Sequence, residues 1–210
     1  MDLGGLQRVR ARRQAGMRGL YAIVDGSSPH DPIALVSAFL RGGAQVIQLR
    51  LKQAGARELL RVAREAGPLC LARGALLLVN DRPDVARLAG ADGVHLGQDD
   101  LPVAEARAVL GEEALVGVST HSDAEIDAAV AAEADYIGFG PIFATATKKS
   151  TAPGAAQLPP PHGPSGLALA VRRAGKVPVV AIGELCLAPD PEARARALAS
   201  AFGGGGAGGR

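Results

Sequence analysis

The chain has 210 residues, a formal net charge of +2 and 48% hydrophobic residues. This length favours one domain with a sizeable core and makes two domains unexpected. The small net charge, with Lys and Arg spread out rather than clustered, argues against a nucleic-acid-binding surface.

The ends and the cysteines of the chain indicate its compartment. No apolar run reaches the ~18 residues of a membrane span, and the N-terminus lacks the apolar stretch of a signal peptide. We therefore expect a cytoplasmic protein. Cys70 and Cys186 lie far apart without metal-ligand spacing, so we interpret both as packing residues. The basic stretch from Arg8 to Arg18 is interpreted as a solvated segment within an N-terminal extension, residues 1–19.

Short apolar runs recur along the chain and predict seven buried strands. They cover residues 20–24, 45–50, 75–80, 93–97, 114–119, 135–140 and 177–183. Their nearly continuous apolar character is typical of parallel strands covered on both faces.

The stretches between these strands predict helices. Apolar residues recur at helical spacing, and the stretches begin after Asp, Ser or Pro and end at Gly, as in residues 31–43, 56–67, 82–90, 102–111 and 122–134. Alternating strands and helices predict a parallel sheet with right-handed crossovers. A repeat of about 20–30 residues favours a TIM-type (β/α) barrel over an open sheet. We therefore expect a single α/β barrel domain over residues 20–202.

The C-terminal part departs from a complete barrel. Asp190 and Pro191 predict the start of a helix that ends near Phe202. The Gly-rich tail, residues 203–210, is expected to be disordered, because Gly has no side chain to bury in a core strand. The eighth strand is therefore expected to be missing. Open edges on the first and seventh strands predict a cover, either the C-terminal helix or a second chain in a homo-oligomer.

Polar side chains gather where the predicted strands end, which is where (β/α) barrels carry their chemistry. They are Gln48, Arg50, Lys52, Asn80, Asp81, Asp99, Asp100, Ser119, His121, Thr145, Thr147, Lys148 and Lys149. Carboxylates on two neighbouring strand ends suit Mg²⁺, which takes one or two carboxylates and fills its other positions with water and phosphate oxygens. Arg and Lys beside them would face those oxygens. The sequence therefore predicts a magnesium-diphosphate site.

Several of these residues have a second interpretation. Asp81 could cap the helix that follows it, and one of Asp99 and Asp100 could be a cap while the other is the ligand. His95 lies inside a strand and is interpreted as a core histidine. Tyr21 is assigned to packing. No partner carboxylate can be identified for His121, so a Ser-His-Asp device is not supported.

Four segments resemble the thiamine phosphate synthase family in order and spacing. They are "QLRLK", "VNDRPDVARLAGADGVHLGQDDLP", "VGVSTH" and "DYIGFGPIFATATKK", and with the flanking strands the resemblance covers roughly Leu20 to Gly183. It implies a TIM-barrel transferase that joins hydroxymethylpyrimidine diphosphate to thiazole phosphate, forming thiamine phosphate and releasing pyrophosphate. Dissociative loss of the diphosphate with Mg²⁺ as cofactor is part of this expectation.

The resemblance also implies residue roles. Asp81 and Asp100 look like the Mg²⁺ ligands. Arg50, Lys52, Ser119 and Lys148 look like diphosphate contacts, and we expect Lys148, Ser119 and Arg50 to act in catalysis. Gln48 and Asn80 look like pyrimidine-side contacts, while Thr145, Thr147 and Gly183 look like part of the acceptor-phosphate site.

Two features leave other functions open. Glu184 stands where the family has a second Gly after the seventh strand, which puts a negative charge near the expected acceptor phosphate. A non-catalytic barrel that binds only the donor diphosphate is therefore one alternative. A tautomerase-like relative acting on the thiazole, suggested by His121, is another. The Pro- and Gly-rich stretch within residues 150–166 is either a lid over the mouth or disordered.

Overall fold

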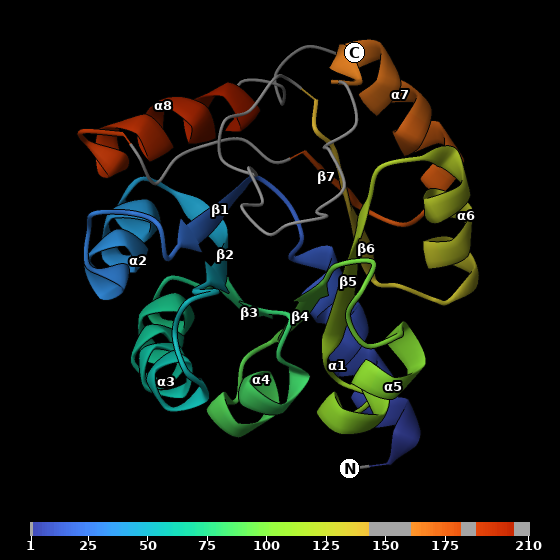
Figure 1. Cartoon of the computed structure of the whole chain (residues 1–210), viewed down its shortest axis with the longest axis horizontal. Coiled ribbons are helices and arrows are strands. Elements are labelled where there is room, and N and C mark those ends of the chain that lie inside the picture. Colours follow the sequence, from blue (N-terminus) through green and yellow to red (C-terminus); the bar gives the residue numbers. More distant parts are fainter. Residues whose placement is uncertain (1, 143–160, 182–187, 204–210) are drawn as a thin grey trace.

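Parallel pairing of neighbouring strands in chain order defines the fold (Figure 1). The computed structural model describes residues 2–142, 161–181 and 188–203. Its strands are β1 (Leu20–Asp25), β2 (Ala44–Arg50), β3 (Leu76–Asn80), β4 (Gly93–Leu96), β5 (Leu115–Thr120), β6 (Tyr136–Phe139) and β7 (Val179–Ala181). All seven predicted strands are confirmed, and they form one sheet in the order β1 to β7.

Helices surround this sheet and alternate with its strands. They are α1 (Leu3–Ala15), α2 (Pro32–Arg41), α3 (Ala56–Ala72), α4 (Pro83–Ala89), α5 (Val103–Leu110), α6 (Asp123–Ala131), α7 (Gly163–Ala174) and α8 (Pro191–Gly203). In Figure 1 the strands form the inner ring, and α2 to α8 lie outside it. The chain therefore adopts the (β/α)-barrel class that its sequence predicts.

Side-chain caps explain where several helices begin. Asp31 accepts hydrogen bonds from the backbone N–H groups of Ile33 and Ala34 at the start of α2. Asp190 accepts one from Ala193 (2.9 Å), which confirms the predicted start of α8. Such caps satisfy N–H groups that have no partner inside the helix.

One helix end differs from the prediction. The pattern predicts that α3 ends at Gly67, but the helix continues through Pro68 to Ala72. The added turn buries Cys70 against the sheet, and this burial favours the longer helix although Pro removes one backbone donor. Burial, and secondarily the carboxylate of Asp92, raises the pKa of the Cys70 thiol to about 12. Cys70 is therefore an inert packing residue, as predicted; Cys186 lies outside the described residues.

The barrel is not closed between its first and last strands. Among the described residues, β1 pairs only with β2 and β7 only with β6. The expectation that an eighth strand is missing holds for this part of the chain. Helix α8 packs against α2 at the β1 side of the seam: a Cβ on Gly42 would lie 2.5 Å from the Cβ of Ala195, and Arg41 pairs with Glu192 at 2.7 Å. The tail from residue 204 lies outside the described residues.

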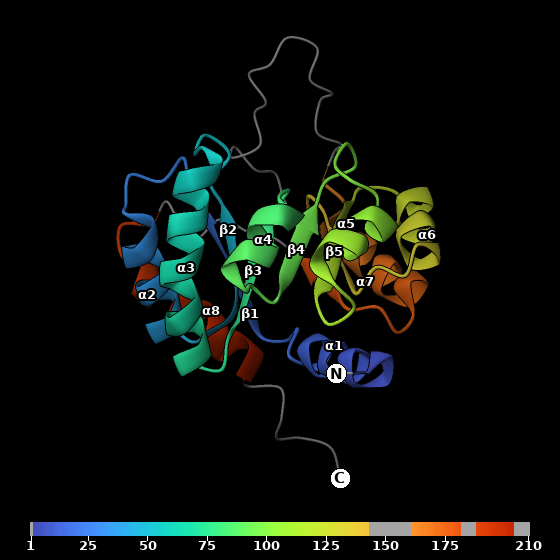
Figure 2. The same ribbon diagram turned by 90° about the horizontal axis from the view of Figure 1, so that it is seen from below.

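The N-terminal segment is not simply solvated, which corrects the prediction. Residues 3–15 form α1, which Figure 2 shows lying across one end of the barrel. Arg13 pairs with Asp92 (2.9 Å), and Gln14 donates to the backbone oxygen of Asp135 (2.7 Å). Both aspartates directly precede strands, so α1 is fastened to the N-terminal edge of the sheet by polar contacts. A basic pattern without an apolar face gave no sign of this docking.

No helix among the described residues is long and apolar enough to cross a membrane.

Asp135 makes several of the polar contacts at the N-terminal end of the barrel. Replacing it tests how much these contacts contribute to stability. Its carboxylate is almost fully buried and accepts hydrogen bonds from the Val116 N–H (2.8 Å) and from Arg107 (2.8 Å). We expect Asp135→Ala to lower the free energy of unfolding by about 3 kcal/mol, because two buried donors lose their acceptor.

Urea denaturation measures this effect, with Asp123→Ala as the matched control. Asp123 also pairs with an arginine, Arg173, but its side chain is 72% exposed. Its loss should cost less than about 1 kcal/mol. Equal losses in the two variants would contradict the role assigned to Asp135.

Candidate active site

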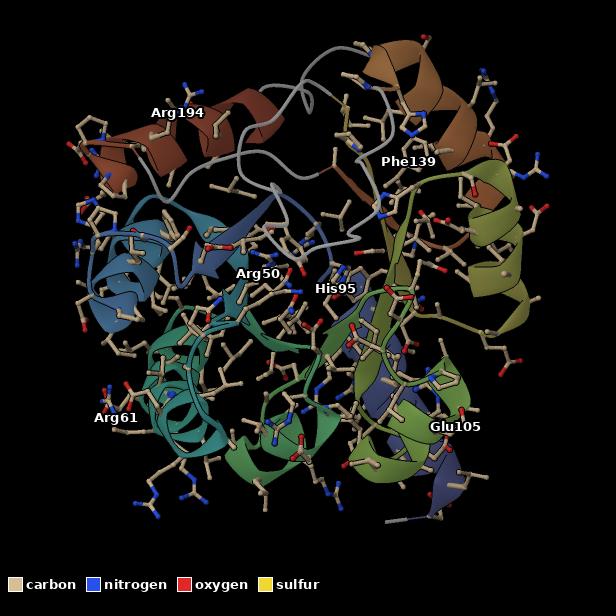
Figure 3. The ribbon with its side chains drawn as sticks, viewed as in Figure 1. Arg50, Arg61, His95, Glu105, Phe139 and Arg194 are labelled. Atoms are coloured by element: carbon tan, nitrogen blue, oxygen red, sulfur yellow. The ribbon has the colours of Figure 1, made fainter. Side chains whose placement is uncertain are left out.

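The C-terminal strand ends converge on one mouth, and side chains from six strands reach it or lie just below it. Figure 3 shows Arg50 and His95 near the middle of the ring of strands, whereas Arg61, Glu105 and Arg194 lie on outer helices. Asp25, Gln48, Asn80 and His95 are among the few polar side chains that are buried. Buried polar groups in a barrel need partners, and their contacts determine the chemistry of the site.

The first ion pair of the mouth joins the ends of β1 and β2. Arg50 donates from Nη1 to Oδ2 of Asp25, and the other oxygen of Asp25 accepts from the backbone and the hydroxyl of Ser27 (2.9 and 2.7 Å). Burial alone would raise the Asp25 pKa, but the hydrogen bonds from Ser27 and Arg50 outweigh it and lower the pKa. Asp25 is therefore ionised at neutral pH and holds the guanidinium in place. Asp25 was not predicted as a site residue, although it directly follows the predicted strand 20–24.

A carboxylate pair joins the ends of β3 and β4. Lys52 lies 3.3 Å from Oδ2 of Asp81, and Asp81 is within hydrogen-bonding reach of Asp100. Burial and the neighbouring Asp100 carboxylate raise the Asp81 pKa, although Lys52 opposes this. Two carboxylates that repel each other beside an open mouth form a site that a divalent cation would stabilise. The donor set thus fits Mg²⁺, the metal expected from the sequence.

The structure excludes the alternative of helix caps for these residues. Helix α4 begins after Arg82 and helix α5 after Pro102, and neither N-terminus has a side-chain cap. Asp100 instead accepts the backbone N–H of Gly97 at 2.6 Å, which fixes its carboxylate at the end of β4. Asp81 has a positive φ of 62°, a conformation that Asp tolerates better than most residues. The alternative that one of Asp99 and Asp100 caps α5 is therefore excluded.

A chain of hydrogen bonds runs below the mouth inside the barrel. We call it the buried chain; its members, in spatial order, are Ser119, His95, Tyr136, Tyr21, Gln48 and Asn80. Successive polar atoms lie 2.9, 3.0, 3.3, 2.8 and 2.5 Å apart. It links a predicted diphosphate contact, Ser119, with the two predicted pyrimidine contacts, Gln48 and Asn80.

Two interpretations from the sequence change here. Tyr21 is not only a packing residue, because its hydroxyl donates to Oε1 of Gln48. His95 is buried in the core as predicted, but its Nε2 lies 2.9 Å from the hydroxyl of Ser119. Tyr136, which the sequence analysis did not single out, connects the two. Burial, more than any neighbour, raises the pKa of Tyr21 and of Tyr136, so both phenols keep their protons at neutral pH.

The remaining polar contacts hold the β5 end in position. Nδ1 of His121 lies 2.5 Å from the backbone oxygen of Gly140, and its backbone N–H donates to Glu125. Gln98 donates to the backbone oxygen of Ser119 (2.5 Å). These contacts tie His121 to the backbone at the end of β6 rather than to a carboxylate in a triad, in agreement with the sequence analysis.

A pocket of about 210 Å³ opens beside the carboxylate pair. It is lined by Leu51, Lys52, Ala54, Leu59, Asn80, Asp81 and Arg82. The predicted site residues at or just beyond the C-terminal ends of β2 to β5 are Gln48, Arg50, Lys52, Asn80, Asp81, Asp100 and Ser119. Thr145, Thr147, Lys148 and Gly183, together with Glu184 and the stretch 150–160, lie outside the described residues.

The fold and the site define a (β/α)-barrel protein whose mouth combines a carboxylate pair with cationic and amide side chains. Comparison with known proteins assigns the family. The family model described as thiamine monophosphate synthase matches residues 20–197. The chain belongs to this family, as the motifs in its sequence predict.

Individual relatives support the assignment. The chain is 51% identical to a thiamine-phosphate synthase of Anaeromyxobacter dehalogenans over 181 residues, which covers 85% of this chain and 75% of the relative. It is 45% identical to a thiamine-phosphate synthase of Laribacter hongkongensis, over 77% and 82% of the two chains. A solved thiamine phosphate pyrophosphorylase of Pyrococcus furiosus superposes with a TM-score of 0.76 at 28% identity, covering 90% of this chain and 98% of that one.

Gly117 makes room for the centre of the buried chain. A Cβ at this position would lie 2.0 Å from the ring of Tyr136. We expect Gly117→Ala to displace the ring and to lower the free energy of unfolding by about 1–3 kcal/mol, because the overpacked interior must shift. Urea denaturation measures the change. Gly4→Ala is the control: its added Cβ meets only the flexible end of Arg8, at 3.5 Å, and in a helix Ala is the better residue. A Gly117→Ala variant as stable as the control would contradict this packing.

The raised pKa of Asp81 predicts how the stability of the metal-free protein depends on pH. A carboxyl whose folded pKa lies above its unfolded pKa stabilises the fold below the unfolded pKa, and this contribution is lost as pH rises through the folded pKa. Asp81→Asn removes the ionised group, and Asn also tolerates positive φ. We therefore expect the variant to be more stable than the parent at pH 7, and the difference to shrink as pH falls through the folded pKa of Asp81 and to be gone below about pH 4.

Urea denaturation across this pH range tests the expectation, with Asp84→Asn as control. The Asp84 pKa is lowered, mainly by its hydrogen bond with Arg82. Its replacement should therefore not stabilise the protein at pH 7. An Asp81→Asn variant that loses stability at pH 7 would show that the carboxylate is favourably paired without metal.

Proposed function

We propose that this protein is a transferase that joins hydroxymethylpyrimidine diphosphate to thiazole phosphate, giving thiamine phosphate and pyrophosphate. The observation that carries the proposal is the grouping of Arg50, Lys52, Asp81, Asp100 and Ser119 at one mouth of a barrel of the thiamine monophosphate synthase family. These side chains offer cations, a hydroxyl and a metal-binding carboxylate pair to one diphosphate group.

The charge changes of the reaction suit these residues. When the donor's C–O bond breaks, negative charge grows on the leaving diphosphate, and the electron-rich aminopyrimidine carries the positive charge left on its methylene carbon. Arg50, held by Asp25, and Lys52 would stabilise the growing negative charge without moving. Such preorganised contacts typically contribute about 3–4 kcal/mol each to the rate. Dissociative loss of the diphosphate thus needs little covalent machinery from the protein.

Asp81 and Asp100 would hold the Mg²⁺ ion in this proposal. When bound there, the ion would neutralise diphosphate oxygens as the charge develops. The chain's own contribution is to hold the two carboxylates together: Gly97 fixes Asp100, and the backbone N–H of Asp81 donates to the backbone oxygen of His95 (2.9 Å). Gln48 and Asn80 would bind the pyrimidine, and Lys148, Thr145, Thr147 and Gly183 complete the proposed phosphate contacts.

A second candidate is a barrel that binds the donor diphosphate without turnover. The observation that favours it is the open seam between β1 and β7 in the described part of the sheet. In this candidate the donor side is intact and the acceptor phosphate lacks the backbone N–H donors that an eighth strand and its loop would supply.

The proposal extends to the compartment. Both substrates are phosphate esters with several charges, and charged groups cross a lipid bilayer only at high cost. The cytoplasm is therefore the proposed location of the enzyme.

Product formation with both substrates and Mg²⁺ separates the two candidates. The transferase predicts thiamine phosphate with the parent and at least a hundredfold loss with Asp81→Ala, because the metal site loses a ligand. Asp84→Ala, which alters an exposed carboxylate outside the site, should keep most of the activity. Absence of product, combined with Mg²⁺-dependent binding of the donor in calorimetry, would reject the transferase in favour of the binding protein.

A further inference from the structure

The buried chain contains two kinds of group, an imidazole and two amides, whose hydrogen-bond direction is reversible. His95 carries its proton on either ring nitrogen, and an amide offers a carbonyl oxygen and an NH₂ group of similar size. In the structure, Tyr21 donates to the carbonyl of Gln48, whose NH₂ donates to Oδ1 of Asn80. This sets the direction at one end.

The direction of the hydrogen bonds at the Gln48–Asn80 end determines their direction at the Ser119 end. Both phenols have one proton to donate, since burial keeps them neutral. Because the Tyr21 proton points to Gln48, the contact between the two phenols is a hydrogen bond only if Tyr136 donates. His95 must then donate to Tyr136 from Nδ1, and its Nε2 accepts the Ser119 proton. In this arrangement Ser119 presents only lone pairs to the mouth.

The reverse arrangement uses the same heavy-atom positions. With both amides turned over, Gln48 donates to Tyr21, Tyr21 to Tyr136, and Tyr136 to Nδ1 of His95. The proton of His95 then lies on Nε2 and points to Ser119, whose hydroxyl is free to donate into the mouth. No group gains or loses a net proton: hydroxyls rotate, amides turn, and the imidazole releases one proton to water and takes up another. A mixed arrangement leaves a buried group unsatisfied, so the direction changes along the whole chain.

We propose that the buried chain couples the two ends of the donor site, with His95, Tyr136 and Tyr21 as positioning residues. The proposal rests on the proposed function, in which the diphosphate contacts Ser119 and the aminopyrimidine contacts Asn80. An anion at Ser119 requires a donor there and therefore selects the reverse arrangement. At the other end this frees the carbonyl of Asn80, which accepts the amino group of the pyrimidine. Diphosphate binding thus prepares the pyrimidine pocket, and by linkage the pyrimidine prepares the diphosphate pocket.

The tautomer of His95 is a direct readout of this change. Nitrogen NMR of the full chain with isotope-labelled histidine distinguishes a protonated Nδ1 from a protonated Nε2, and a His95→Gln sample assigns the signal. We expect the proton on Nδ1 in the free protein and on Nε2 after addition of inorganic diphosphate with Mg²⁺. An unchanged tautomer would overturn the proposal.

Tyr21→Phe provides the matched variant because it removes one hydroxyl from the middle of the chain. In the free variant Tyr136 has lost the Tyr21 oxygen as acceptor, so its proton points to Nδ1 of His95, and the His95 proton should lie on Nε2 both without and with inorganic diphosphate. The link to Gln48 is lost. The calorimetric probe is an aminopyrimidine that carries a methyl group in place of the diphosphate-bearing arm. Addition of Mg²⁺-diphosphate should raise the affinity of the parent for this probe. The factor of increase should be at least five times larger for the parent than for the variant. Equal changes in parent and variant would overturn the proposal.

These readouts separate the inference from the proposed function. A tautomer change in a protein that forms no thiamine phosphate would reject the proposed reaction and support the coupling. Product formation with an unchanged His95 tautomer would support the reaction and reject the coupling.

Discussion

Parallel pairing of strands in chain order is the constraint on which the rest of this structure depends. It brings the C-terminal end of every strand to one edge, so side chains separated by up to 115 positions in the sequence meet in one small space. The same pairing places the N-terminal ends at the opposite edge, where α1 docks on the Asp92 carboxylate and the Asp135 backbone oxygen, just before two of the strands. One arrangement of the backbone thus creates both the stabilising contacts at the N-terminal strand ends and the candidate active site at the C-terminal strand ends.

The polar interior is costly unless each group has a partner, and this requirement shapes the mouth. Asp25 fixes Arg50, Gly97 fixes Asp100, and Tyr21 fixes Gln48. Arg50, Asp100 and Gln48, which are expected to bind substrate or metal, are each held by a residue that need not touch either. Asp81 and Asp100 repel each other and are satisfied best by a cation. A preorganised site of this kind suits a reaction whose main demand is stabilisation of charge on a leaving group.

The sequence predicted the strands, the barrel class and most of the mouth because these follow from local patterns. Apolar runs gave the strands, and the rule that barrel chemistry follows strand ends gave Arg50, Asp81 and Ser119. The predictions from the sequence that were wrong or incomplete concern contacts between residues far apart in the chain. The docking of α1 depends on Asp92 and on the backbone of Asp135, which lie far along the chain, and the role of Tyr136 depends on Gly117 making room for its ring. The end of α3 beyond Gly67 depends on burial of Cys70 against the sheet, which no local stop signal encodes.

The central claim is that the carboxylate pair and the cations beside it form one metal-diphosphate site. A crystal structure of the protein with inorganic diphosphate and Mn²⁺, which scatters anomalously and replaces Mg²⁺ in oxygen sites, tests it most directly. The account predicts an anomalous peak between the carboxylates of Asp81 and Asp100, with the diphosphate bound to this metal and to Arg50. A metal bound elsewhere, or a diphosphate that contacts neither carboxylate-bound metal nor Arg50, would contradict it.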